Sequence, residues 1–346
     1  MKIKQLIKRL IEKLQSLALP LCSVMPMTSS VFFAFFSRDF YYEHQAILKA
    51  RLKYLKSSGN HGRSSALLRR NIHRIEKGLI MRPRRDVFAL DYLSETLNAF
   101  HCAMSHADFS QSEQQWAIDV LTEYFSVVDL TQTTIAKNHQ LFQSIVTADT
   151  ATTNKKPYLY TDKVNHNIDY EQLLTLTQAR RSTRWFTNQA VELSKIKLAA
   201  QVALQAPSAC NRQPYQFYVI DQQPLLGQLA KLPGGTAGFA DNIPTLIAVV
   251  GDLSYYPYTR DRHVIYIDAS LASMQFMLAL ETLGLSSCPI NWPELYTLDK
   301  KVSKLLKLPQ YKRVVMFMAV GYPDHTGQIA FSDKKDPNDI VIKVNA

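Results

Sequence analysis

The sequence has little of what metal centres and disulfide-stabilised folds require. Its four cysteines (Cys22, Cys102, Cys210 and Cys288) are scattered, and none forms a CxxC pair. Such spacing argues against a disulfide framework or a metal site and is typical of a reducing compartment. HExxH, GxSxG, P-loop and GxGxxG motifs are also absent. The sequence therefore gives no signal for zinc proteases, α/β-hydrolases, P-loop enzymes or dinucleotide-binding Rossmann domains.

Acidic residues are scarce at the start of the chain. Residues 1–85 contain 18 lysines and arginines but only 4 acidic residues, a net charge of +14 in a chain whose total is +11. The remaining 261 residues thus sum to −3. A basic end of this kind favours an anionic partner, namely a membrane surface, an acidic polymer or nucleic acid. Of these we expect a membrane surface and not nucleic acid.

Residues 1–37 lack a hydrophobic run long enough for a membrane span. Residues 14–37 carry no charge, but two prolines and a Thr-Ser-Ser cluster interrupt them. Residues 1–17 instead have the pattern of an interfacial helix, with an apolar stripe and five cations beside it. The stripe consists of Ile3, Leu6, Ile7, Leu10, Ile11, Leu14 and Leu17. We therefore expect a cytoplasmic protein with peripheral contact at the inner face of a membrane; docking of this helix on its own domain is the alternative.

Length and periodicity indicate two domains after this basic segment. With 346 residues, 47% of them hydrophobic, the chain can bury a sizeable core. Apolar residues recur at helical spacing through 38–150, which predicts an all-α domain. Residues 151–168, rich in Thr, Asn and Lys, read as a linker. In 169–346 strand and helix signals alternate, which predicts an α+β domain.

Two basic stretches of the helical domain stand out. His73–Gly78 ends a predicted helix that Gly78 would cap, and Arg82–Arg85 follows it. They form either a cationic patch suited to phosphate or carboxylate, or a charged helix end followed by an exposed basic turn.

The most informative stretch of the α+β domain is 206–220, which reads as a helix end, a polar loop and a buried strand. Pro207 stops the helix, and the strand fixes the other end of the loop. Upstream, residues 180–184 (RRSTR) place three guanidinium groups and two hydroxyls within five residues. Arginine forks match phosphate oxygens bidentately, although such a run alone is also typical of a solvated turn.

Together, RRSTRWF, APSACNRQPYQF and the apolar helix predicted at 270–285 resemble the nitroreductase family of FMN-dependent oxidoreductases. The resemblance covers residues 170–344. It implies an α+β fold with a mixed or antiparallel sheet flanked by helices, FMN as cofactor, NADH or NADPH as electron donor, and a homodimer whose sites lie between subunits. It also implies two-electron ping-pong transfer to a small-molecule acceptor. The flavin carries the chemistry, so no catalytic side chain is expected.

The resemblance also assigns cofactor-binding residues by group. Those expected at the flavin phosphate are Arg180, Arg181, Ser182 and Arg184, with Lys334 or Lys335 from the C-terminus. Those expected at the ribityl chain and ring are Pro207, Ser208, Asn211 and Gln213. Ile290, Asn291 and Trp292 match the segment over the ring. The family often has glycine there, so the presence of Asn291 and Trp292 leaves the size of the substrate space open.

Two alternatives to simple electron transfer stay open at this point. The same fold could serve a biosynthetic dehydrogenase or a flavin-modifying enzyme. It could also be a binding or scaffold module without activity. No residue pattern chooses the acceptor.

Overall fold

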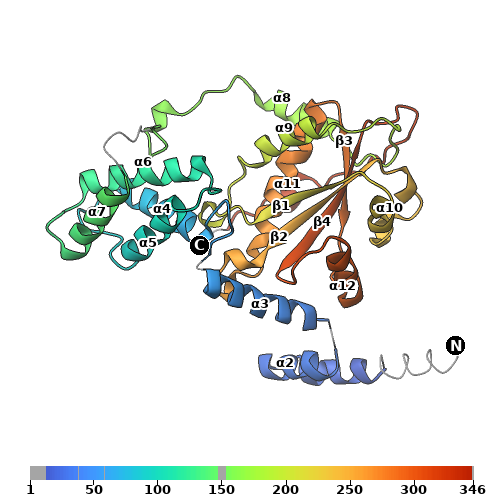
Figure 1. Ribbon diagram of the computed structural model, residues 1–346. Coiled ribbons are helices and arrows are strands. Elements are labelled where there is room, and N and C mark those ends of the chain that lie inside the picture. Colours follow the sequence, from blue (N-terminus) through green and yellow to red (C-terminus); the bar gives the residue numbers. More distant parts are fainter. Residues whose placement is uncertain (1–12, 38, 58, 147–152, 345–346) are drawn as a thin grey trace.

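A computed structural model describes residues 13–37, 39–57, 59–146 and 153–344 (Figure 1). It confirms the α+β class: an antiparallel sheet of four strands is preceded by a mostly helical part. The helices of the N-terminal part are α2 (Pro26–Phe35), α3 (Tyr41–Ser57), α4 (Ala66–Leu79), α5 (Leu93–Met104), α6 (Gln111–Val127) and α7 (Thr133–Ile145). The later elements are α8 (Tyr170–Ala179), α9 (Leu193–Ala203), β1 (Tyr215–Ile220), α10 (Leu225–Ala230), β2 (Thr245–Asp252), α11 (Val264–Thr282), β3 (Ser286–Asn291), α12 (Tyr296–Leu305), β4 (Lys312–Gly321) and α13 (Pro337–Ile340).

The sheet is the middle layer of three. Its strand order is β1-β2-β4-β3, and all neighbours are antiparallel. Successive side chains of a strand point to opposite faces. On β2, Leu246 and Ala248 therefore join the core under α10 and α12, whereas Ile247 joins the core under α9 and α11. Figure 1 shows the two helix pairs on opposite sides of the sheet.

The edge strand β3 was not predicted, because its sequence (SSCPIN) carries neither alternation nor β-branched enrichment. Pro289 has no N–H to donate, and such a residue is tolerated on an edge strand. β3 pairs with β4 on one side, and on the other a single parallel bridge joins Ser287 to Ser182.

Helices α4 to α7 share a hydrophobic core of their own, centred on residues such as Leu68, Ile72 and Tyr124. Ser65 caps α4 by accepting a hydrogen bond from the Leu68 N–H. Gly78 does not cap α4 as expected, because the helix continues through it to Leu79. A β-carbon at Gly78 would lie 2.3 Å from the Phe88 ring, so close packing explains this glycine.

Helix α3 packs on the sheet part, although its sequence position places it in the predicted 38–150 domain. Its small residues Ala46 and Ala50 are buried in one cluster with Tyr256 and Ile265. The Tyr42 hydroxyl also lies 2.9 Å from Ser303 Oγ on α12. Helix α3 therefore lies against the sheet part in space.

The described part of the basic N-terminal segment lies apart from the body of the molecule (Figure 1). Residues 13–22 are helical and lead into α2, where Phe32 is the one buried residue. Leu21, Met27 and Phe35 are each more than three-quarters exposed. Most of the predicted amphipathic stripe falls in residues 1–12, outside the described residues.

Among the described residues, one helix is long and apolar enough to cross a membrane by length and composition. It comprises Thr259–Thr282 and includes α11, and half of its apolar window is buried inside the fold. A core helix passes the same test, so this is weak evidence for a span.

Candidate functional site

The loop formed by residues 206–214 has an unusual backbone. Three of its residues that are not glycine, Cys210, Asn211 and Gln213, have positive φ angles of 52°, 52° and 53°. Such left-handed residues cost on the order of 1–3 kcal/mol each, somewhat less for asparagine, and persist only where the surroundings fix them. They are concentrated at binding and catalytic sites, so this loop is a candidate for one.

Several hydrogen bonds hold the 206–214 loop. The Ala209 N–H donates to Asp268 Oδ2 at 3.0 Å, and the Gln213 N–H donates to Ser208 Oγ at 3.1 Å. The Gln213 side-chain amide donates to Asn211 Oδ1 at 3.0 Å. Burial raises the pKa of Asp268, and the hydrogen bonds from Ala209 and Tyr256 partly offset this.

The helical part also contributes to this loop. Arg69 Nε on α4 donates to the Asn211 carbonyl oxygen at 2.7 Å, and Arg69 Nη1 lies 3.1 Å from Glu113 Oε2 on α6. Glu113 in turn accepts from the Ser64 hydroxyl and the Ser65 N–H. The 206–214 loop is therefore fixed by both parts of the chain.

The 180–184 segment lies against β3. The Thr183 N–H donates to the Ser287 carbonyl oxygen at 3.1 Å, and Ser182 bridges to Ser287. Arg180 Nε and Ser287 Oγ are buried and have no hydrogen-bond partner among the described residues. Arg184 is exposed, and its guanidinium is 5.9 Å from the Phe239 ring centroid.

The structure does not bring the 180–184 segment and the 206–214 loop together within one chain. The Ala209 N–H donates to Asp268, which lies near the start of α11. Arg181, in contrast, lines a 270 Å³ cavity together with Glu281, which lies near the end of α11. Burial raises the pKa of Glu281, and nearby Arg180 opposes that shift. At roughly 1.5 Å per residue, Asp268 and Glu281 are about 20 Å apart along α11. The two groups thus lie against opposite ends of α11 in one chain.

The other expected residues are spread over two regions. Ile290 and Trp292 are buried, and Trp292 donates its indole N–H to Asp299 Oδ1 at 3.0 Å. The Trp292 side chain packs into the core under α12. Asn291 is exposed on the opposite face of the strand. Lys334 and Lys335 are exposed on the C-terminal tail.

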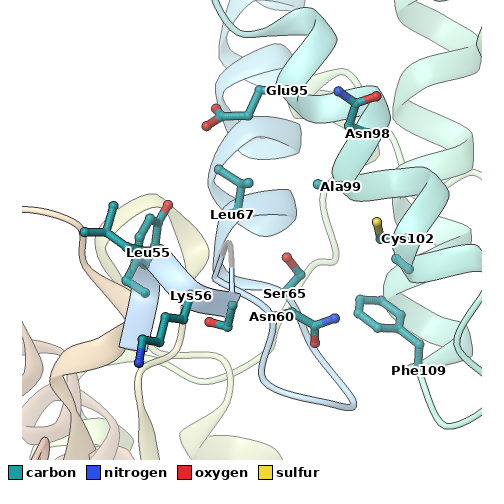
Figure 2. Close-up of a pocket in the computed structure, with 13 residues that line it drawn as sticks. Leu55, Lys56, Asn60, Ser65, Leu67, Glu95, Asn98, Ala99, Cys102 and Phe109 are labelled. Carbon is teal, nitrogen blue, oxygen red and sulfur yellow. The ribbon is translucent and has the colours of Figure 1, made fainter. Parts of the chain in front are cut away.

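A cavity of about 680 Å³ lies elsewhere, between the end of α3 and helices α4 and α5 (Figure 2). Leu67, Asn98, Cys102 and Phe109 are among its lining residues, and none of the expected flavin residues belongs to it. Within the described ranges, no group of three or more His, Cys, Asp or Glu side chains could hold a metal ion.

Sequence reasoning missed two features of the site. Nothing in the sequence shows that Cys210 and Gln213 adopt left-handed backbone, since neither residue type favours it. The contact between Arg69 and Asn211 joins residues 142 positions apart, so local patterns do not reveal it.

Comparison with known proteins supports the resemblance. The sequence model of the Nitroreductase family matches residues 177–322. Iodotyrosine deiodinase from Thermotoga neapolitana is 26% identical over 199 residues, which is 51% of this chain and 98% of that protein. A putative NADH dehydrogenase/NAD(P)H nitroreductase from Archaeoglobus fulgidus is 30% identical over 159 residues, covering 44% of this chain and 86% of that protein. The chain belongs to the nitroreductase family.

Among solved structures, an FMN-dependent nitroreductase from Clostridium difficile is 27% identical, with 50% of this chain and 99% of that chain covered and a TM-score of 0.43. Membership in the nitroreductase family makes this chain a nitroreductase-family oxidoreductase, and the family typically binds FMN. The family match begins at residue 177, so helices α2 to α7 lie outside it.

Proposed function

We propose that the chain is an FMN-dependent oxidoreductase that takes two electrons from NADH or NADPH and passes them, in a ping-pong sequence, to a small-molecule acceptor. The observation that carries the proposal is the pair of buried polar atoms, Arg180 Nε and Ser287 Oγ, that lack partners among the described residues. Buried donors and hydroxyls of this kind are normally satisfied, and a bound phosphate or ribityl chain would satisfy them. The residues present therefore fit FMN.

The roles of the residues follow from their chemistry. Arg180, Arg181 and Arg184 offer charged donors for the phosphate, and Ser182 adds a hydroxyl. Lys334 or Lys335 would add a point charge without a bidentate fork. When bound, FMN supplies two-electron transfer between donor and acceptor, so no side chain need act as a general base.

The 206–214 loop would serve the ribityl chain and ring. Asn211 and Gln213 offer side-chain amides there, and the backbone around Pro207 and Ser208 would line the same site. Fixed backbone donors near a flavin stabilise the charge that develops on reduction. Along the ring we assign the Asn291 side chain and the backbone of its two neighbours, Ile290 and Trp292.

We further propose that the functional unit is a homodimer. The two binding groups lie against opposite ends of α11, where Asp268 and Glu281 are about 20 Å apart, so we infer that a second copy supplies the missing group. Helices α9 and α11 expose several large apolar residues, namely Leu198, Val202, Ile267, Leu271 and Met274. The C-terminal tail also exposes apolar residues, among them Phe331 and Ile342, which a partner subunit would cover.

A second candidate reaction is reductive removal of halide from an aromatic substrate. The relative from Thermotoga neapolitana is named an iodotyrosine deiodinase, and the alignment covers 98% of it. In this reaction a carbon–halogen bond is replaced by carbon–hydrogen, NAD(P)H supplies the two electrons, and halide leaves. Release of iodide from an iodophenol on addition of NAD(P)H would favour this candidate over nitroaromatic or quinone reduction.

The membrane surface stays a proposal for the basic N-terminal segment. In its described part, apolar residues such as Leu21, Met27 and Phe35 are exposed, which leaves them free for a bilayer interface. We therefore propose a cytoplasmic enzyme with peripheral contact at the inner face of a membrane.

The flavin content of the purified full-length protein tests the proposed function. We expect one FMN per chain. A protein that carries no flavin and takes up none of an added excess would contradict the proposal and favour a scaffold or binding role.

A further inference from the structure

Another cavity, of about 380 Å³, lies where helix α4 meets the 206–214 loop. Four arginines line it, two from α4 (Arg70 and Arg74) and two from the sheet part (Arg212 and Arg260). Its one acidic lining residue is Asp261, so three positive charges are in excess. We call it the arginine cavity. It exists because the helical part packs against the loop, and it shares Ala209 and Cys210 with that loop.

Arg212 has the properties expected of a ligand-binding residue in the arginine cavity. The residue is only 7% exposed, and its Nε has no hydrogen-bond partner among the described residues. The Tyr256 ring holds its guanidinium at 4.7 Å from the ring centroid. Asp268 is a nearby carboxylate, but its Oδ2 already accepts from Ala209 and Tyr256. A buried cation with an unused donor indicates an anionic ligand.

The other three arginines are oriented but not neutralised by strong partners. The Arg74 guanidinium stacks 3.5 Å from the Tyr92 ring centroid and lies 3.6 Å from Asp91. Arg70 lies 3.5 Å from Glu95, and Arg260 lies 3.9 Å from Asp261. The Asp91 and Glu95 side chains are 78% and 50% exposed, so these are weak surface ion pairs that a ligand can replace.

We propose that the arginine cavity binds the oxyanion group, a phosphate or a carboxylate, of an acidic acceptor substrate. This inference rests on the proposed function, since it places that group beside the loop assigned to the flavin. Arginine forks bind such oxyanions bidentately, and the volume suits one small molecule. It also assigns a role to the basic stretch His73–Gly78, which lies outside the family match: Arg74 forms one wall of the substrate site.

Binding of three small nitroaromatic probes tests the inference without any redox step. They are 4-nitrophenyl phosphate, 4-nitrobenzoate and the neutral 4-nitrobenzyl alcohol, titrated calorimetrically into the full-length protein as purified, at constant ionic strength. The variants are Arg74→Gln and Arg260→Gln, whose side chains are partly or largely exposed and whose loss should not prevent folding. Arg51→Gln, on the exposed face of α3 and outside the cavity lining, is the matched control.

We expect at least one anionic probe to bind once per chain and the neutral alcohol to bind at least tenfold more weakly. Each cavity variant should weaken anion binding about tenfold, because each removes a charge-assisted contact, and Arg51→Gln should not. Preference for the phosphate or for the carboxylate probe identifies the group. Equal binding of neutral and anionic probes, no binding of either anion, or unchanged affinity in both cavity variants would overturn the inference.

Flavin content of the same samples separates the two proposals. Arginine-dependent anion binding by a protein that takes up no FMN would support the cavity and contradict the proposed function. A flavin-loaded protein without such binding would contradict the cavity alone.

Discussion

The contact between Arg69 and the 206–214 loop gives the sharpest prediction about how the helical part supports the site. Arg69 pairs with Glu113 at 3.1 Å, and their side chains are 15% and 3% exposed. Breaking a buried pair costs 3–5 kcal/mol when nothing else satisfies the remaining charge. Here the cost lies at the lower end of that range, because Glu113 still accepts hydrogen bonds from two neutral donors, Ser64 and Ser65. We therefore expect Arg69→Met to lower the free energy of unfolding by about 3 kcal/mol.

A double-mutant cycle isolates the pair. Glu113→Gln alone should cost about 2 kcal/mol, and the double variant about 3.5 kcal/mol, which gives a coupling energy of about 1.5 kcal/mol. Urea unfolding of the four proteins measures these values. Arg69→Met should also weaken FMN binding about tenfold, because the Asn211 carbonyl loses its charged donor. Additive stability effects together with unchanged FMN affinity would refute the view that this pair holds the loop; Arg51→Met is the control for loss of an arginine.

The remaining predictions concern the cofactor, the assembly and the membrane. Arg181→Ala or Arg184→Ala should weaken FMN binding about 10- to 100-fold in a fluorescence titration, and unchanged affinity in both variants would remove these residues from the phosphate site. The double variant Ile267→Glu/Leu271→Glu should sediment as a monomer and lose flavin; a monomer that keeps FMN would contradict a site shared between subunits. The full-length protein should co-sediment with anionic vesicles at low salt, since each engaged cation contributes about 1 kcal/mol, and deletion of residues 1–37 should abolish this without loss of flavin. Equal binding to neutral vesicles, or none to either, would rule out the membrane proposal, whereas destabilisation on deletion would indicate a docked helix.

Much of the fold could be predicted because its elements have strong local signals. Strand β2 is a continuous apolar run that ends at Gly251 and Asp252, and α11 is a long apolar helix. The family and the α+β class could be predicted from the motifs RRSTRWF and APSACNRQP, because they occur in the order typical of the nitroreductase family. Edge strand β3 lacked such signals, because its pairing with β4 comes from tertiary contact and not from its own composition.

The parts that could not be predicted depend on contacts between distant residues. The packing of α3 on Tyr256 and the hydrogen bond from Arg69 to Asn211 join segments separated by well over a hundred residues. The resemblance did not show how Asn291 and Trp292 are oriented, and alternation along the strand buries the Trp292 side chain and leaves Asn291 exposed. Arg70, Arg74, Arg212 and Arg260 share one cavity, although no sequence window contains them all.

An anaerobic titration of the full-length, FMN-loaded protein with NADH and with NADPH tests the central claim most directly. The account predicts that the oxidised flavin band bleaches with one equivalent of one of these donors per FMN, and that an added electron acceptor restores it. A flavin band that neither donor bleaches would contradict a nicotinamide-dependent oxidoreductase.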